Sequence, residues 1–399
     1  MSDPPLASVI VNNYNYARFL REAVDSALNQ TYPNTEVIVV DDGSTDGSRE
    51  IIASYGDRII PVLKENGGQN SALNAGFSQS RGKVIFFLDS DDAMLPTAAE
   101  AAMELFGESD VAKVHWPLVE LDECSRETGR IWWGRLPEGN MRNVLVDEGP
   151  DGVAYPPTSG NAFARSFLES IFPLPDVWPK FVSRPSARET RWMVRPGPDL
   201  YLSTLAVLHG RIKRLAKPQA FYRVHGQNGY SSLKFEDRLA FDLALFDHAS
   251  KAAAEYCKRL QISVDPELWR TRSWAHRIYR ATLDIATLVP FGATFILVDG
   301  DEWKTDPLLA GRKRIPFLEH DGQYWGNPED DATAIRELER LREAGASFIV
   351  FAWSRFWWLE YYSELYRYLR TQFRCVRDDE RITAFDLRAQ GTHLRREDG

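Results

Sequence analysis

The chain has 399 residues and 44% hydrophobic content, enough for two to three globular domains with real cores. Its formal net charge of −9 argues against a nucleic-acid surface and against electrostatic adhesion to anionic lipid, although a local basic patch is compatible with it. The three cysteines, Cys124, Cys257 and Cys375, are far apart, so neither a disulfide framework nor a thiolate zinc site is predicted, and a reducing cytoplasm fits best.

No export or membrane segment is expected. Residues 1–5 lack a basic region followed by an apolar one, so we predict no signal peptide. The longest apolar stretch, residues 285–298, contains Pro290 and Gly292 and is too short to span a bilayer. We therefore expect a cytoplasmic protein, for which peripheral membrane association stays open.

The first elements alternate between the hydrophobic pattern of a strand and that of a helix. Residues 7–11 predict a buried strand, and the apolar positions of residues 19–28 recur at helical spacing before Pro33 ends the segment. Residues 36–40 predict a second buried strand. The order strand, helix, strand implies parallel pairing with a right-handed crossover, so the fold class is α/β.

Both strands end in polar clusters. Residues 12–16 follow the first strand, and an acidic run that begins with Asp41 and Asp42 follows the second. Ser44 or Asp46 can cap the next helix, so part of this run has a purely structural explanation. Asp41 and Asp42 do not need that explanation, and they are candidates for binding.

A third strand is predicted over residues 58–63, with a loop over 64–69 and a helix over 70–80. The pair Gly67 and Gly68 in the loop permits unusual backbone angles near a ligand. Glycine pairs are also common in ordinary turns, so both interpretations remain.

The run from residue 81 to 92 ends abruptly in Asp89, Asp91 and Asp92. Its apolar part predicts a strand buried on both faces, whose C-terminal edge is where open α/β sheets bind ligands. Mutual repulsion of the carboxylates is relieved either by a cation such as Mg²⁺ or Mn²⁺, or by water. The alternatives are therefore a metal site and a solvated turn that caps the next helix.

Four motifs in this order resemble the inverting family 2 glycosyltransferases of the GT-A fold: residues 11–15, 40–46, 66–69 with 72–76, and 88–92. The resemblance implies a nucleotide-sugar donor, with a UDP-sugar favoured over a GDP- or dTDP-sugar. It places Asp91 on a Mg²⁺ or Mn²⁺ ion that bridges the diphosphate. The residues implied around the donor are Asn13, Tyr14 beside the base, Asp41 and Asp42 at the base edge, Asn66, Gln69, Asn74, and Asp89 near the ribose.

Two later segments resemble the acceptor side of the same family. Residues 158–162 are one, and Asp199 matches the last acid of a Glu-Asp motif although Pro198 replaces the Glu. Asp199 is the implied catalytic base, and a helix N-cap is its structural alternative. Residues 221–228 resemble the closing Tyr-Arg-x-His stretch, which places His225 near the diphosphate and metal; a purely structural histidine is the alternative.

Residues 188–192 resemble the Gln-x-x-Arg-Trp signature of processive polysaccharide synthases. We reject that assignment, because the segment precedes the candidate base, starts with Arg188 and has no membrane helices with it. Asp176 and Glu189 are the next candidates if the base is not Asp199.

We expect three parts: a GT-A domain over residues 1–235, a helical connector over 236–290 and a smaller α/β domain over 291–399. The last part could carry a site at Asp299 and Asp301, but packing or assembly is favoured. Its aromatic cluster at residues 353–362 is compatible with a hydrophobic core, a subunit interface or a platform for a sugar ring. A homo-oligomer is therefore one of the alternatives. The elements predicted here are strands at 294–299 and 347–351, a helix at 331–344 and a hairpin around Asp378 and Asp379.

The resemblance implies a metal-dependent inverting transferase that moves a sugar to a hydroxyl of a carbohydrate or lipid-linked glycan, in polysaccharide or glycoconjugate synthesis. A nucleotidyltransferase on a similar sheet is disfavoured by Asp199 and residues 221–228. A degenerate glycosyltransferase that serves as a binding or scaffolding subunit is the alternative from another class.

Overall fold

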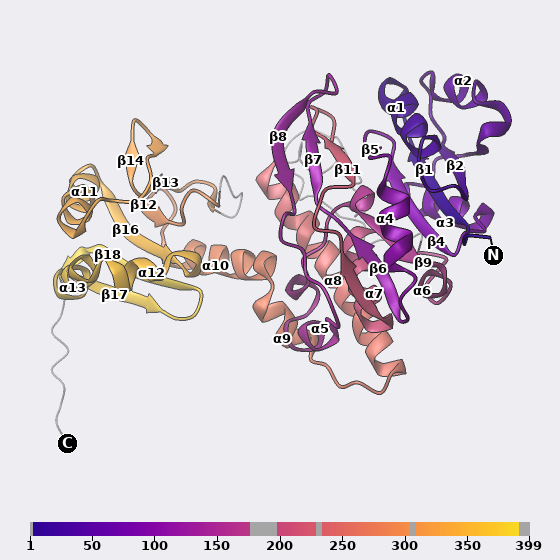
Figure 1. Cartoon of the computed structure of the whole chain (residues 1–399). Helices are drawn as coiled ribbons and strands as arrows, with labels where there is room; N and C mark the ends of the chain where they lie inside the picture. Colours follow the sequence, from indigo (N-terminus) through magenta and orange to yellow (C-terminus); the bar gives the residue numbers. More distant parts are fainter. Residues whose placement is uncertain (1–2, 176–197, 229–233, 304–308, 391–399) are drawn as a thin grey trace. The chain divides into compact units, whose positions relative to one another are not determined.

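The structure is a computed structural model that describes residues 3–175, 198–228, 234–303 and 309–390 (Figure 1). Asp176, Glu189 and the segment 188–192 lie outside the described residues. Within the described residues, no helix combines the length and the apolar character needed to cross a bilayer.

The chain divides into two compact units. The first is Met1–Ser232 with Ala240–Ser273, and the second is Leu233–Leu239 with Trp274–Gly399. The helical segment expected between them is present, but it is shared: most of α8 and all of α9 belong to the first unit, and α10 belongs to the second. The three expected domain boundaries stay predictions. The helices are α8 (Phe235–Arg259), α9 (Pro266–Arg272) and α10 (Trp274–Leu288).

A seven-stranded sheet in the order β10-β6-β9-β4-β1-β2-β3 is the frame of the first unit. The four strands β1 to β4 pair in parallel, as predicted, whereas β9 is antiparallel to its neighbours β4 and β6. The expected α/β fold is therefore confirmed here. The strands are β1 (Ala7–Asn13), β2 (Thr35–Asp42), β3 (Ile60–Lys64), β4 (Val84–Asp89), β6 (Val111–His115), β9 (Asn161–Ala164) and β10 (Arg211–Arg214).

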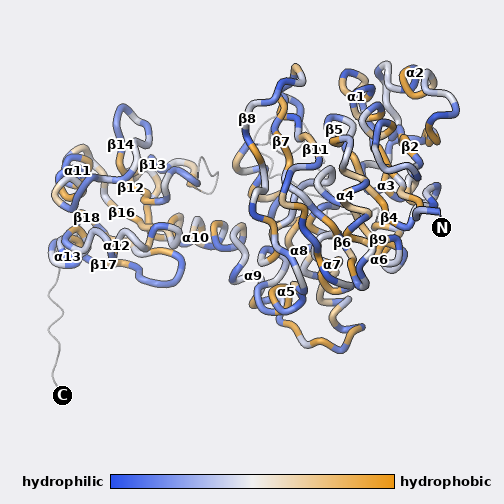
Figure 2. The backbone as a smooth tube through the Cα atoms, in the orientation of Figure 1, coloured by the Kyte–Doolittle hydropathy of each residue, from blue (hydrophilic) through white to orange (hydrophobic). Residues whose placement is uncertain are grey.

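Both faces of this sheet are covered, which explains the continuous apolar runs in its strands. In β4, Phe86 and Leu88 belong to one core with α1 and α4, while Ile85 and Phe87 belong to a second core with α3, α7 and α8. Figure 2 shows the hydrophobic colouring on these inner strands. The helices of this unit before α8 are α1 (Ala17–Leu28), α2 (Ser48–Ala53), α3 (Gln69–Gln79), α4 (Ala98–Leu105), α5 (Arg142–Glu148), α6 (Arg165–Glu169) and α7 (Asp199–His209).

The parallel register brings the polar strand ends to one edge. Asn13 at the end of β1 is paired with Asp41 of β2, and Asn12 is paired with Asp89 of β4. Three of the four motifs therefore meet where ligands bind in open α/β sheets.

A second, four-stranded sheet was not predicted from the sequence. Its order is β5-β11-β7-β8. No hydrophobic period reveals its strands, because β5, β7 and β11 have at most four residues and β8 is almost entirely exposed. It pairs β5, directly after the acidic loop, with β11, so residues 221–228 come to lie beside residues 89–92. The strands are β5 (Ala93–Met94), β7 (Leu118–Leu121), β8 (Glu127–Trp132) and β11 (Ala220–Arg223).

The second unit is built on a five-stranded sheet in the order β13-β12-β16-β18-β17. The predicted strands, helix and terminal hairpin are all present, which confirms a second α/β unit. Its elements are β12 (Thr294–Val298), β13 (Lys313–Pro316), β14 (Glu319–His320), β15 (Gln323–Tyr324), α11 (Asp331–Glu343), β16 (Ala346–Ala352), α12 (Trp357–Tyr361), α13 (Ser363–Gln372), β17 (Phe373–Asp378) and β18 (Ile382–Gln390).

The aromatic cluster of this unit is divided between core and surface. Trp358 and Tyr362 are buried in the core, whereas Trp357 and Tyr361 are 40% and 69% exposed. Asp299 is buried and accepts hydrogen bonds from Arg314 and from backbone N–H groups of the loop that follows it. This carboxylate therefore holds its own loop, which fits the expectation of a packing role.

Helix α3 lies so close to the sheet that position 76 has no room for a side chain. A Cβ on Gly76 would be 2.4 Å from Ile10 Cγ2 and 3.1 Å from Val40 Cγ2. We expect Gly76→Ala to lower the free energy of unfolding by ~1–3 kcal/mol, because a packed core resists added volume. Urea denaturation measures the change. Ser78→Ala on the exposed face of α3 is the control and should shift it by less than ~0.5 kcal/mol; equal losses would contradict the close approach.

Candidate active site

A cavity of about 860 Å³ opens at the carboxyl edge of the first unit's large sheet. Its volume lies in the range of sites that enclose a small ligand. Asp41, Asn74 and His225 are not part of its lining. The predicted site residues that do line it are Asn13, Tyr14, Asp42, Asn66, Gln69, Asp89, Asp91 and Asp199.

Asp92 is the structural member of the acidic loop. It is 2% exposed, and both of its oxygens are used: Ser159 Oγ donates to Oδ2 at 2.6 Å and the Arg223 N–H donates to Oδ1 at 2.9 Å. Burial, followed by the charges of Asp91 and Asp89, raises the pKa of Asp92 well above its usual value. The alternative of a solvated turn is therefore wrong.

Asp89 faces the cavity from the end of β4. Its Oδ1 accepts hydrogen bonds from Asn12 Nδ2 and Gln69 Nε2, both at 2.9 Å. Burial and then the negative charges of Asp91 and Asp199 raise the pKa of Asp89. The loop thus concentrates negative charge that a cation would neutralise.

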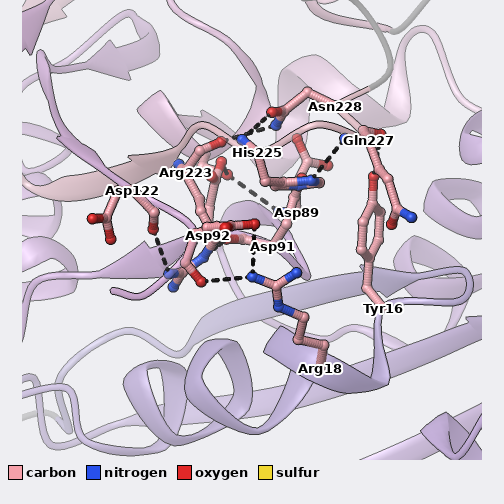
Figure 3. Close-up of polar contacts among 12 residues, drawn as sticks. Tyr16, Arg18, Asp89, Asp91, Asp92, Asp122, Arg223, His225, Gln227 and Asn228 are labelled. Atoms are coloured by element: carbon pink, nitrogen blue, oxygen red, sulfur yellow. Dashed lines mark hydrogen bonds and ion pairs between the residues drawn. The ribbon is translucent and has the colours of Figure 1, made fainter. Parts of the chain in front are cut away.

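Asp91 is the acid that stays available. Among the described residues, the only polar partner of its carboxylate is His225, whose Nε2 lies 3.1 Å from Oδ2 (Figure 3). The Gln227 N–H donates to His225 Nδ1 at 3.2 Å. The neutral ring therefore carries its proton on Nε2 and donates it to Asp91.

A divalent cation fits Asp91 better than it fits His225. The described residues contain no group of three or more acids, histidines or cysteines placed to share an ion. A Mg²⁺ or Mn²⁺ ion needs only one or two carboxylates when phosphates and water complete its shell, so Asp91 suffices as the protein anchor. Ligation by His225 Nε2 requires the ring proton to move to Nδ1, at the loss of the Gln227 hydrogen bond.

Arg223 closes the acidic loop from the second sheet, a role that was not predicted from the sequence. The side chain is fully buried and donates to the Asp91 carbonyl at 2.7 Å, to Ser125 Oγ at 2.8 Å and to Glu22 at 2.7 Å. Its guanidinium lies 4.7 Å from the centre of the Phe19 ring. Arg223 therefore fixes the loop that presents Asp91 (Figure 3).

Asp42 lines the cavity and explains the glycine pair. Its carboxylate accepts from Lys64 Nζ at 2.6 Å and from the N–H groups of Gly67 and Gly68 at 2.9 and 2.6 Å. Gly68 has a φ of 86°, which favours glycine, so the pair is needed for this close approach. Asn66 donates to the Asp42 carbonyl at 3.0 Å and lines the cavity beside it.

Asp41 and Asn74 lie behind the cavity wall. Asp41 is fully buried and accepts from Asn13, from the Ser44 N–H and from Arg49. Asn74 exchanges two hydrogen bonds with the backbone of Leu174, at 2.8 and 2.7 Å. Any contribution of these two residues to donor binding is therefore indirect.

Asp199 is the first residue of α7 and lines the cavity. The N-cap position is Pro198 and no side chain caps this helix, so the N-cap alternative is wrong. The Thr158 hydroxyl donates to Asp199 Oδ1 at 2.7 Å. Burial raises the pKa of Asp199 to about 6, which suits a general base near neutral pH.

Several residues of the site were missed by sequence reasoning. Trp133 lines the cavity with a φ of 58°, rare for a bulky residue, and lies 5.8 Å from the Tyr222 ring. Lys113, buried within the strand β6, was also missed, whereas Thr158, which holds Asp199, lies in the predicted acceptor-side segment 158–162. A lysine in an apolar run was the one signal that could have found Lys113.

The comparisons with known proteins cover mainly the N-terminal part of the chain, which contains the donor-side motifs. Residues 8–171 match the family model described as glycosyl transferase family 2, which confirms the resemblance of the N-terminal part; the match ends before Asp199 and His225. An uncharacterized glycosyltransferase of Nostoc sp. is 35% identical over 232 residues, which are 56% of this chain and 66% of the relative. One of Rickettsia prowazekii is 47% identical over 106 residues, which are 27% of this chain and 33% of the relative.

The chain therefore spans less than two thirds of the length of either relative. Among solved structures, a mannosyltransferase from Pyrobaculum calidifontis in complex with GDP-Man and Mn²⁺ aligns with a TM-score of 0.43 and 18% identity. That alignment covers 72% of this chain and 77% of the other.

Arg223 provides a test of how the acidic loop is held. We expect Arg223→Met to lower the free energy of unfolding of the first unit by ~1–3 kcal/mol, because the Asp91 carbonyl and Ser125 Oγ lose their hydrogen-bond donor. Urea denaturation measures this loss. Arg18→Met is the matched control, since Arg18 and its partner Glu123 are mostly exposed, and should cost less than ~1 kcal/mol. A similar small loss for both variants would refute the role of Arg223.

Proposed function

Because residues 8–171 form a glycosyl transferase family 2 domain, we propose that the protein is a metal-dependent inverting glycosyltransferase. It moves a sugar from a nucleotide-diphosphate sugar to a hydroxyl of a carbohydrate or lipid-linked glycan. The observation that carries the proposal is the cavity that gathers Asp42, Asp89, Asp91 and Asp199 at one sheet edge. The family resemblance favours a UDP-sugar and a place in polysaccharide or glycoconjugate synthesis.

The residues of the donor-side wall are suited to bind a nucleoside. Asn12 Oδ1 and Asn13 Oδ1 are buried without a partner among the described residues, and both side chains line the cavity. Buried acceptors are normally satisfied, so the N–H groups of a base or the hydroxyls of a ribose suit them. Tyr14 is 48% exposed beside them and offers a ring face for a base.

The diphosphate would lie at Asp91. A bound Mg²⁺ or Mn²⁺ supplies charge neutralisation for the leaving group. Asp91 would hold this ion, while Arg223 and Asp92 keep the loop in place. Because Asp89 and Asp92 are buried acids with raised pKa values, added positive charge at this edge stabilises their ionised forms.

Asp199 would act on the acceptor. Its ionised carboxylate takes the proton of the acceptor hydroxyl, the hydroxyl oxygen forms a bond to the anomeric carbon, and the bond to the diphosphate oxygen breaks. A positioned base of this kind contributes ~10²–10⁴-fold. Its pKa of about 6 means that transfer rises as the pH is raised through about 6, because only the ionised form accepts a proton.

The metal assignment is tested with Asp91→Asn. We expect release of nucleoside diphosphate from UDP-, GDP- or dTDP-sugars to depend on Mn²⁺ or Mg²⁺ in the wild type and to fall by ~10²-fold or more in the variant. The melting temperature should hold, because the carboxylate lies at the cavity rather than in the core. Asp57→Asn, an exposed acid on the Gly56–Arg58 turn, is the control. Unchanged release by Asp91→Asn would contradict the assignment of Asp91 to the metal.

The base assignment is tested with Asp199→Asn. Donor affinity, measured by calorimetry, should stay near wild type while transfer falls by ~10²-fold or more, because the carboxylate acts on the acceptor. Asn keeps the size of the side chain and can still accept from Thr158. Near-normal transfer would move the base elsewhere, with Asp176 and Glu189 as the next candidates.

A further inference from the structure

Lys113 is a buried cation that the proposed mechanism leaves unused. It lies in β6 and is 1% exposed. Its Nζ donates to Ser203 Oγ at 2.7 Å and lies 5.9 Å from the centre of the Phe163 ring. An ammonium group in such a site is costly unless a charge nearby compensates it.

The compensating charge is on Asp199. Ser203 follows Asp199 by four residues in α7, so the two side chains lie on one face of the helix, one turn apart. Among the described residues, Asp199 is the charged group that stabilises the Lys113 ammonium. Burial still lowers the pKa of Lys113 to about 7, and it raises the pKa of Asp199 to about 6. Burial thus disfavours the ionised form of each group, and the opposite charge of the other group favours it.

We propose that Lys113 is a positioning residue for the base. Its ammonium group, anchored by Ser203 one helical turn from Asp199, favours the ionised form of the Asp199 carboxylate at the cavity, so that this carboxylate is ready to take the proton of the acceptor hydroxyl. Lys113 is not part of the cavity lining and touches no reacting atom. This inference rests on the proposed function, because it assigns Asp199 the role of base.

The other groups around Asp199 do not replace Lys113. Thr158 donates a hydrogen bond to the carboxylate but carries no charge. His115, on the same face of β6 as Lys113, is kept neutral, since burial lowers its pKa to about 3. Asp89 on β4 and Tyr222 on β11 interact with Asp199 as negative or neutral groups. Lys113 is therefore the cation, among the described residues, that favours the ionised base.

The test is the pH profile of kcat/KM for Lys113→Met. Removing the positive charge raises the pKa of Asp199, so the acidic limb of the profile should move to higher pH by ~1 unit or more. At pH values below this limb, transfer by the variant should be ~10-fold slower than transfer by the wild type. At high pH it should return toward the wild-type rate, and donor affinity should be unchanged. Ser203→Ala, which frees the ammonium, should shift the limb in the same direction by less.

Lys217→Met is the matched control, because Lys217 is exposed, and it should leave the profile unchanged. A merely structural role predicts an equal loss at every pH together with a lower melting temperature. Either that pattern or an acidic limb that stays in place would overturn the proposal.

A second measurement does not depend on transfer, or on whether Lys113→Met folds. In protein labelled with ¹³C-lysine, NMR titration of Lys113 should show a pKa well below the usual value of a lysine. Asp199→Asn should lower it further, because the stabilising negative charge is gone. An unchanged Lys113 titration in Asp199→Asn overturns the pairing. If the pairing is observed but wild-type protein transfers no sugar, it is the proposed function that fails.

Discussion

The site depends on the contact between Arg223 and the acidic loop. Three carboxylates within four residues repel one another, and a loop that carries them needs contacts with other segments to keep one shape. Arg223 provides such contacts from β11, 131 residues further along the chain, through its backbone N–H to Asp92 and its guanidinium to the Asp91 carbonyl. With Asp92 committed in this way, Asp91 is left facing the cavity.

Pairs of one buried residue and one cavity-lining residue recur around the cavity. Asp41 is buried behind the wall and holds Asn13, while its neighbour Asp42 organises the glycine loop and faces the cavity. On the acceptor side, Lys113 lies behind Asp199 as Arg223 lies behind Asp91. Each of the acids that line the cavity, Asp42, Asp91 and Asp199, has a hydrogen-bond partner in the protein, because a buried charge without a partner is strongly destabilising.

Local patterns were enough for much of the fold and for the identity of the site. The apolar runs before Asn12, Asp41 and Asp89 predicted three parallel strands, because a strand covered on both faces needs apolar residues at every position. The strand ends then had to share one edge, so the gathering of Asp42, Asp89 and Asp91 followed from the sequence. The same reasoning predicted β12, β16 and the terminal hairpin of the second unit, but not β13, β14 or β15.

Only the tertiary structure decided what each acid does. Asp91 and Asp92 are adjacent and chemically identical, and their roles differ because Ser159 and Arg223, from distant segments, donate hydrogen bonds to the carboxylate of Asp92 and not to that of Asp91. Lys113 meets α7 across 90 residues of sequence, and β11 reaches the acidic loop through a sheet of strands as short as two residues. Such pairings leave no periodic trace in the sequence, since they are set by packing of whole elements and not by local preference.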